Sequence, residues 1–213
     1  MSDVIDLPLR HRFVAGTKPA TPLLLLHGTG GNEDDLLPLG RALSPGAALL
    51  SPRGAVSEHG MPRFFRRLAE GVFDEDDLRR RTADLARFVA AARAAYGLAA
   101  PVAVGFSNGA NIAAALLLLH PGVLVGAVLL RAMVPLTTPP GLTGPDLTRP
   151  GTPVLLLSGM ADPIVRLENS ARLEADLVQA GARVTRRVMP GGHEPTQADL
   201  SASADWLQTE HMR

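Results

Sequence analysis

The stretch GFSNG, residues 105–109, places Ser107 between two glycines, where a strand-like apolar run meets a helix-like run. It fits the pattern G-x-S-x-G, in which a serine sits on a sharp turn from a strand into a helix. Such a turn lifts the hydroxyl above the sheet, and the glycines remove side chains that would collide there. The stretch therefore predicts Ser107 as a nucleophile. The alternative is a serine that only caps the helix.

A serine nucleophile needs a base, and the base needs an acid that orients it. With a nucleophile on such a turn, the acid and then the histidine follow in the chain, each just past a strand. Asp162 follows the apolar run PVLLLSG, and His193 lies in the glycine-rich PGGHE after the next strand-like run. His193 alone among the histidines combines this order with a flexible loop. Asp162 also suits a helix cap, and Asp146 is the weaker candidate for the acid.

A second glycine-rich turn supplies candidates for binding the negative oxygen formed during acyl transfer. LHGTGG, residues 26–31, follows an early apolar run. We expect the backbone amides of Thr29 and Asn108 to face the Ser107 oxygen as an oxyanion hole. The alternative is a turn that merely reverses the chain. Phosphate binding is disfavoured, because the turn has neither G-x-G-x-x-G nor a Walker lysine.

Strand-like and helix-like segments alternate along the chain. Apolar runs predict strands at 22–28, 47–54, 101–107, 124–132, 153–160 and 182–189, with an edge strand at 11–16. Helices are expected at 74–97, 108–120, 163–180 and 196–210, and Asn32 is expected to cap another whose first turn is 33–35. This order predicts an α/β fold with a mostly parallel central sheet and helices on both faces. We expect one domain over residues 1–213.

Composition sets the class of protein. The 213 residues include 21 Lys and Arg against 21 Asp and Glu, which gives no basic excess for nucleic acid. The chain has no cysteine, so a thiolate nucleophile and thiolate metal sites are excluded. Its first residues do not resemble a signal peptide, and its apolar runs fall short of the roughly 20 residues that span a bilayer. We expect a soluble cytoplasmic protein without membrane or nucleic-acid partners.

Two segments could shape a substrate pocket. The expected lining residues are Met61, Phe64 and Phe65 from GMPRFFRR (60–67), and Met133 and Val134 after a strand. Ordinary core packing is an equal alternative for the first group. Arg63, Arg66 and Arg67 could contact an anionic substrate, but surface pairing with Glu70, Asp74 or Glu75 is favoured. The Pro- and Gly-rich loop 135–151 is too short for a helical cap domain, so we expect an open site.

Together, LLLLHGTGGNEDDL, GFSNGANIA, SGMADPIV and PGGHE resemble the α/β-hydrolase superfamily, over about residues 22–194. More narrowly, the chain resembles the small lid-less phospholipase/carboxylesterase group, which includes acyl-protein thioesterases. MPRFFRR and EGVFDEDDL are most similar to its bacterial carboxylesterase branch linked to quinone stress. The resemblance implies Ser107, His193 and Asp162 as a triad, with Thr29 and Asn108 as oxyanion donors. Phe64-Phe65-Arg66 departs from the Trp-Phe/Tyr-Asp of related esterases, so thioesterase substrates do not carry over.

The residues and the resemblance favour a serine carboxylesterase that hydrolyses short- to medium-chain esters through an acyl-enzyme. The expected partner is a small-molecule ester, with no metal and no organic cofactor. A homodimer is an expectation from the resemblance. A thioesterase or lysophospholipase with the same triad is the alternative, followed by a non-catalytic ligand-binding protein of the same fold.

Overall fold

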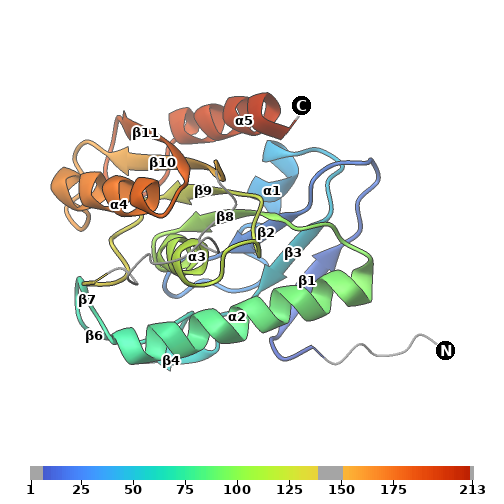
Figure 1. Ribbon diagram of the computed structural model, residues 1–213, viewed down its shortest axis with the longest axis horizontal. Coiled ribbons are helices and arrows are strands. Elements are labelled where there is room, and N and C mark those ends of the chain that lie inside the picture. The colour runs from blue at the N-terminus through green and yellow to red at the C-terminus, as the bar shows by residue number, and fades with distance from the viewer. Residues whose placement is uncertain (1–6, 139–150, 212–213) are drawn as a thin grey trace.

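The computed structural model describes residues 7–138 and 151–211, and its centre is a twisted seven-stranded sheet (Figure 1). The strand order is β1-β3-β2-β8-β9-β10-β11. The strands are β1 (His11–Val14), β2 (Leu23–Leu26), β3 (Leu49–Pro52), β8 (Val102–Phe106), β9 (Gly126–Leu130), β10 (Pro153–Gly159) and β11 (Arg183–Met189). Only β1 is antiparallel to its neighbour in this sheet. The predicted α/β fold, including the edge strand, is confirmed.

Helices cover both faces of the sheet (Figure 1). One face carries α1 (Leu37–Leu43) and α5 (Gln197–His211), and the other carries α2 (Glu75–Tyr96), α3 (Asn108–Leu119) and α4 (Leu167–Gln179). Successive side chains of a strand point to opposite faces. In β2, Leu23 and Leu25 therefore pack under α1 and α5, and Leu24 and Leu26 pack under the helices of the other face. This double burial explains why its sequence is a continuous apolar run.

The helices lie within one residue of their expected bounds, with two exceptions: α4 begins at Leu167 and not at residue 163, and no helix begins directly after Asn32. Asp74 caps α2 by accepting a 3.0 Å hydrogen bond from the Asp77 amide, and Gly97 ends it in the left-handed conformation. Asn32, in contrast, accepts from the amide of Asp34 within a turn, and α1 begins only at Leu37. Glu33 is buried in ion pairs with two arginines, which holds its segment in the turn and outside the helix.

Residues 60–67, for which the sequence predicted no strand, belong to two antiparallel hairpins. The first pairs β4 (Val56–Glu58) with β5 (Met61–Arg63), and the second pairs β6 (Arg67–Ala69) with β7 (Val72–Phe73). Each turns at a glycine with positive φ, Gly60 at 82° and Gly71 at 73°. The second hairpin lies beside the amino-terminal end of α2 (Figure 1).

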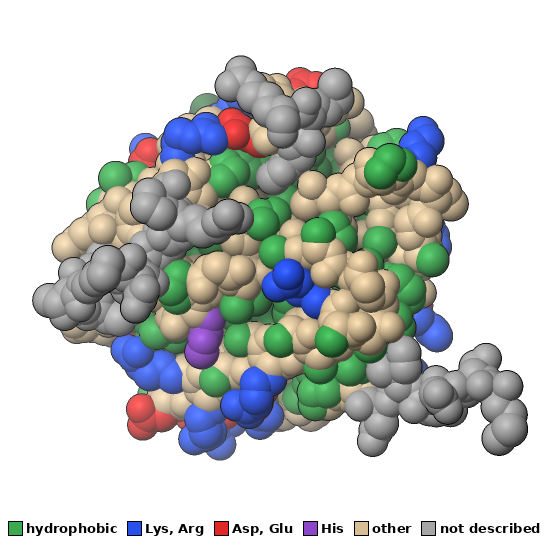
Figure 2. All heavy atoms as spheres, turned by 45° about the vertical axis from the view of Figure 1, so that its right-hand side comes forward, with side chains coloured by type: hydrophobic (Ala, Val, Ile, Leu, Met, Phe, Trp, Pro, Cys, Tyr) green, Lys and Arg blue, Asp and Glu red, His purple; other side chains and the backbone are tan. Residues whose placement is uncertain are grey.

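One face of the molecule carries few charged side chains (Figure 2). On the face shown in Figure 2, hydrophobic and uncharged side chains cover most of the area, and acidic groups lie close to basic ones at its edges. None of the helices in residues 7–138 and 151–211 is long and apolar enough to cross a membrane. The loop predicted at 135–151, with Asp146, lies for the most part outside the described residues.

Candidate functional site

Ser107 occupies a strained turn between β8 and α3. Its backbone angles, φ 50° and ψ −114°, lie where residues other than glycine are rare, and such a conformation costs about 1–3 kcal/mol. The Ser107 amide donates a 2.9 Å hydrogen bond to the carbonyl of Leu130 at the end of β9, which fixes the turn to the sheet. A Cβ atom on Gly109 would lie 2.0 Å from the carbonyl oxygen of Leu26. The glycine therefore lets α3 begin directly against β2.

His193 joins Ser107 to Asp162. Its Nε2 lies 2.9 Å from the Ser107 hydroxyl, and its Nδ1 lies 2.9 Å from the Asp162 carboxylate. The three residues follow the ends of β8, β10 and β11, and the carboxyl ends of parallel strands share one edge of the sheet. The structure thus brings together three residues that the sequence separates by up to 86 positions.

The Asp162 carboxylate is held in its ionised form. Burial alone raises the pKa of Asp162, but hydrogen bonds from the Val165 amide, His193 and the Ile164 amide outweigh it and leave the pKa below its usual value. An ionised carboxylate only accepts hydrogen bonds, so Nδ1 of His193 must be the donor. In the neutral ring, Nε2 then carries the lone pair and can accept the hydrogen bond of the Ser107 hydroxyl.

Arg131 holds the loop that carries His193. It follows β9 in a left-handed conformation, φ 57°, and its side chain is fully buried. It donates to the carbonyl oxygens of Gly192 at 2.8 Å and Glu194 at 3.4 Å, on either side of His193. Two further bonds, at 2.7 and 2.8 Å, bind both carboxylate oxygens of Asp199 in α5. Sequence reasoning missed this pair, although an arginine directly after an apolar strand is a usable signal.

Ser107 and His193 open into a cavity of about 220 Å³. Thr29 and Asn108, the expected oxyanion donors, lie in its wall. As the first residue of α3, Asn108 has an amide without an acceptor inside the helix. The remaining lining residues are Arg63, Arg67, Glu70, Gly71, Phe73, Phe106, Asn111, Met133, Ile164 and Glu194.

Of the five expected pocket residues, one lines this cavity. Met133 lines the cavity, and Val134 lines a neighbouring depression next to it. Phe64 and Phe65 do not line the cavity. They are 3% and 0% exposed within the core, because large aromatic side chains gain most from full removal from water. Met61 is 39% exposed and lies over Gly30, on the edge of the second glycine-rich turn.

Comparisons with known proteins agree with this geometry. The profile of the alpha/beta hydrolase fold matches residues 21–144. The chain belongs to the α/β-hydrolase family. It is 46% identical over 202 residues to the Bacillus subtilis (strain 168) protein named "Putative hydrolase MhqD", covering 94% of this chain and 98% of that one.

Solved structures similar to this hydrolase include a carboxylesterase. The crystal structure of the Bacillus cereus carboxylesterase superposes with a TM-score of 0.89 at 42% identity, covering 95% of this chain and 94% of that one. The structure of YahD with malic acid superposes with a TM-score of 0.85 at 28% identity, covering 94% and 98% of the two chains.

Sequence reasoning favoured the wrong environment for Arg63 and missed Phe73. Arg63 was expected to pair at the surface, but its side chain is buried at the cavity and donates a 2.7 Å hydrogen bond to the Thr29 hydroxyl. Arg66 does pair at the surface, with Asp74 at 2.6 Å, as expected. Phe73 reaches the cavity from the second hairpin, which the sequence did not reveal.

His27 lies in the second glycine-rich turn and has a structural role. Its Nδ1 lies 2.7 Å from the Gly28 carbonyl oxygen, and its Nε2 accepts a 2.9 Å bond from the Gly54 amide. Burial lowers its pKa, so the ring stays neutral and both nitrogens are occupied in fixing the turn. This leaves His193 as the histidine that contacts Ser107.

Proposed function

We propose that this hydrolase is a serine carboxylesterase, with Ser107 as nucleophile, His193 as general base and Asp162 as the acid that orients it. The observation that carries the proposal is the continuous hydrogen-bonded chain from Ser107 through His193 to Asp162, with 2.9 Å at both links. The strained conformation of Ser107 supports it, since strain of this kind persists where function requires it. The carboxylesterase among its structural relatives supports the same class of reaction.

Hydrolysis proceeds in two acyl-transfer steps. The Ser107 oxygen attacks the ester carbonyl carbon while its proton passes to Nε2 of His193. The backbone amides of Thr29 and Asn108 stabilise the resulting oxyanion. The C–O bond to the alcohol then breaks, and the alcohol leaves with the proton from His193. Water, deprotonated by the same nitrogen, attacks the acyl carbon. The bond from that carbon to the Ser107 oxygen then breaks, the serine oxygen takes the proton back from His193, and the acid is released.

The cavity favours short to medium acyl groups. Its volume, about 220 Å³, lies below the roughly 300–1,000 Å³ of typical drug-sized ligand pockets. Phe73, Phe106, Met133 and Ile164 supply an apolar wall. The structure of one relative, YahD, contains malic acid, a dicarboxylic acid, so acyl groups that carry a charge are also candidate substrates.

The test is hydrolysis of 4-nitrophenyl acetate, butyrate and octanoate by the protein and by Ser107→Ala. We expect turnover of the shorter esters, and a loss of about 10³-fold or more in kcat/KM for the variant. Circular dichroism of both proteins controls for folding. Equal, near-background rates in the two proteins would sink the proposal and favour a non-catalytic ligand-binding protein.

A further inference from the structure

Arg63 places a buried positive charge in the wall of the same cavity as Ser107. It ends β5, and its Nη1 donates to the Thr29 hydroxyl at 2.7 Å. The Gly30 amide donates to the carbonyl oxygen of Pro62 at 2.9 Å, so the second glycine-rich turn and β5 are joined by two bonds. The guanidinium of Arg63 is thereby fixed beside the proposed oxyanion hole.

The charge of Arg63 is only partly compensated. Glu58 is the acidic partner, 3.2 Å from Arg63 Nε, but the same carboxylate also accepts a 2.9 Å hydrogen bond from Arg67. The Arg67 hydrogen bond lowers the pKa of Glu58 against the effect of burial, so Glu58 is ionised. Two guanidiniums therefore share one carboxylate, and this group of three residues keeps one positive charge.

Two further carboxylates line the cavity, but they lie at its rim. Glu70 and Glu194 are both exposed, and within residues 7–138 and 151–211 neither forms an ion pair with these arginines. Burial, and secondly the nearby charge of Arg67, lowers the pKa of Arg63. Guanidinium groups nevertheless remain protonated in proteins, so the buried charge persists and an anion in the cavity would offset it.

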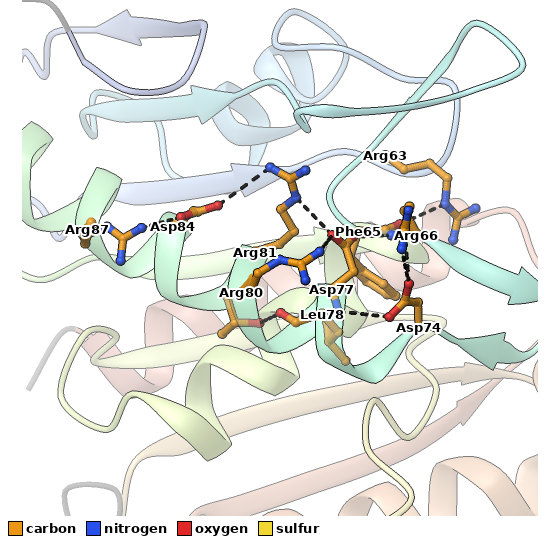
Figure 3. Close-up of polar contacts among 11 residues, drawn as sticks. Arg63, Phe65, Arg66, Asp74, Asp77, Leu78, Arg80, Arg81, Asp84 and Arg87 are labelled. Carbon is orange, nitrogen blue, oxygen red and sulfur yellow. Dashed lines mark hydrogen bonds and ion pairs between the residues drawn. The ribbon is translucent and has the colours of Figure 1, made fainter.

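The backbone around Arg63 is rigidly mounted. The Phe64 amide donates to the side chain of Asn108 at 2.7 Å, and the Arg66 amide donates to the Asp77 carboxylate at 2.8 Å. Figure 3 shows Asp77 reaching from α2 toward this segment, with the arginines of the helix around it. A side chain mounted this way pays little conformational entropy when a ligand binds.

Arg63 also retains donors that no described residue uses. Of its nitrogens, Nε donates to the Phe65 carbonyl oxygen at 3.2 Å and Nη1 donates to Thr29, whereas Nη2 donates to none of residues 7–138 and 151–211. Asn108 Nδ2, buried beside the cavity, lacks an acceptor in the same part of the chain. Arg63 Nη2 and Asn108 Nδ2 are therefore free to bind a further acceptor, whereas Glu58 Oε2, a buried acceptor without a hydrogen bond from the described residues, lies on the other side of Arg63, 3.2 Å from its Nε.

We propose that Arg63 binds a carboxylate carried by the ester, so that the hydrolase prefers anionic esters to their neutral counterparts. This inference rests on the proposed role of Ser107. The acyl group and the alcohol are the two parts of the ester that can carry the carboxylate, and the substrates below separate them.

The test measures the ratio of kcat/KM for matched anionic and neutral esters. Mono-4-nitrophenyl adipate against 4-nitrophenyl hexanoate places the charge on the acyl part, and 3-butyryloxybenzoate against its methyl ester places it on the alcohol. Hydrogen bonds to charged groups contribute enough for Arg63→Met to lower the ratio roughly 10- to 100-fold for at least one pair. We expect the ratio for Arg63→Lys to lie between those of the unmodified protein and Arg63→Met, because lysine keeps the positive charge but lacks the planar guanidinium.

The ratio separates recognition of charge from the support that Arg63 gives Thr29. A misplaced oxyanion donor slows both esters of a pair equally and leaves their ratio unchanged, whereas loss of a carboxylate contact slows only the anionic ester. Arg66→Met is the matched control, since Arg66 is exposed, pairs with Asp74 and lies outside the cavity. Its ratio should stay within about twofold of the unmodified protein, in line with the small energies of surface pairs.

If Arg63→Met does not fold, the same ratio of kcat/KM is measured in Arg67→Met. Arg67 is 29% exposed, and its removal leaves Glu58 to neutralise Arg63, so this ratio should fall too. The inference is overturned if neither pair shows an anionic preference, or if the preference survives in the folded Arg63 or Arg67 variants. Ser107-dependent hydrolysis of the neutral esters would in that case leave the proposed esterase function standing. If no ester is hydrolysed, both proposals fail together.

Discussion

The buried pair of Arg131 and Asp199 gives the sharpest prediction for stability. Both side chains are 0% exposed and are joined by hydrogen bonds of 2.7 and 2.8 Å. Arg131→Met leaves the Asp199 carboxylate in the core, where the amide and hydroxyl of Thr196 are its only other donors among the described residues. Removing one partner of a buried ion pair costs about 3–5 kcal/mol. At roughly 2–4 °C per kcal/mol for a chain of this length, the melting temperature should fall by about 6–20 °C.

The double variant Arg131→Met/Asp199→Leu separates the unpaired charge from the loop contacts. Replacing both partners removes the buried unpaired carboxylate, so we expect it to recover at least half of the lost stability in urea unfolding. Activity should not return with it, because Gly192 and Glu194 still lack the donor that holds the His193 loop. We expect kcat to stay at least about tenfold low while KM changes little, as for a misplaced catalytic group.

Two results would refute this reasoning. The first is a loss of less than about 1 kcal/mol in Arg131→Met, which is within the range of ordinary substitutions. The second is a double variant with normal kcat, which would mean that the loop keeps His193 in place without Arg131. Far-ultraviolet circular dichroism on each variant verifies that rates are compared between folded proteins.

Two further predictions concern stability. Burial raises the pKa of Glu33, but its own amide and two arginines lower it to about 2, so its stabilising effect, present above the unfolded-state pKa, is lost as pH falls toward 2. Glu33→Gln should therefore be less stable at pH 7 and lose less stability between pH 5 and 2, as measured by urea unfolding at each pH. Gly109→Ala should lower stability by several kcal/mol, roughly as for severe overpacking, because its Cβ would lie 2.0 Å from the Leu26 carbonyl oxygen. Gly60→Ala is the control, because Gly60 has a positive φ but open space around it, and it should cost about 1 kcal/mol. Equal losses of stability in Gly109→Ala and Gly60→Ala, measured by thermal melts, would contradict the argument from packing.

The sequence predicted what depends on local pattern and chain order. Continuous apolar runs identified the buried strands, and the order of Ser107, Asp162 and His193 along the chain placed them at one edge of a parallel sheet. The bounds expected for the helix at 74–97 agree with α2, which Asp74 caps and a left-handed Gly97 ends. Asn32 carried a cap signal too, but the ion pairs of Glu33 override it, and they involve arginines outside the segment.

The sequence could not predict the cavity wall, because that wall depends on contacts between distant segments. Within residues 63–65 the arginine faces the cavity, while Phe64 and Phe65 enter the core. From hydrophobicity alone, the two phenylalanines would be expected to line an apolar pocket and the arginine to face the solvent. The observed one is stable because Arg63 finds acceptors in Thr29 and a backbone carbonyl, so its burial leaves its charge hydrogen-bonded.

Asn108 links the two halves of the site. Its side chain accepts the hydrogen bond that fixes the Phe64 amide, 44 residues away in the sequence, and its own amide stands next to the nucleophile. The wall that carries Arg63 and the proposed oxyanion donor are therefore attached to one residue at the start of α3. A displacement of the β5 segment would strain this hydrogen bond directly after Ser107, and it would also strain the two bonds that join β5 to the second glycine-rich turn, so we expect changes in β5 to affect turnover as well as substrate binding.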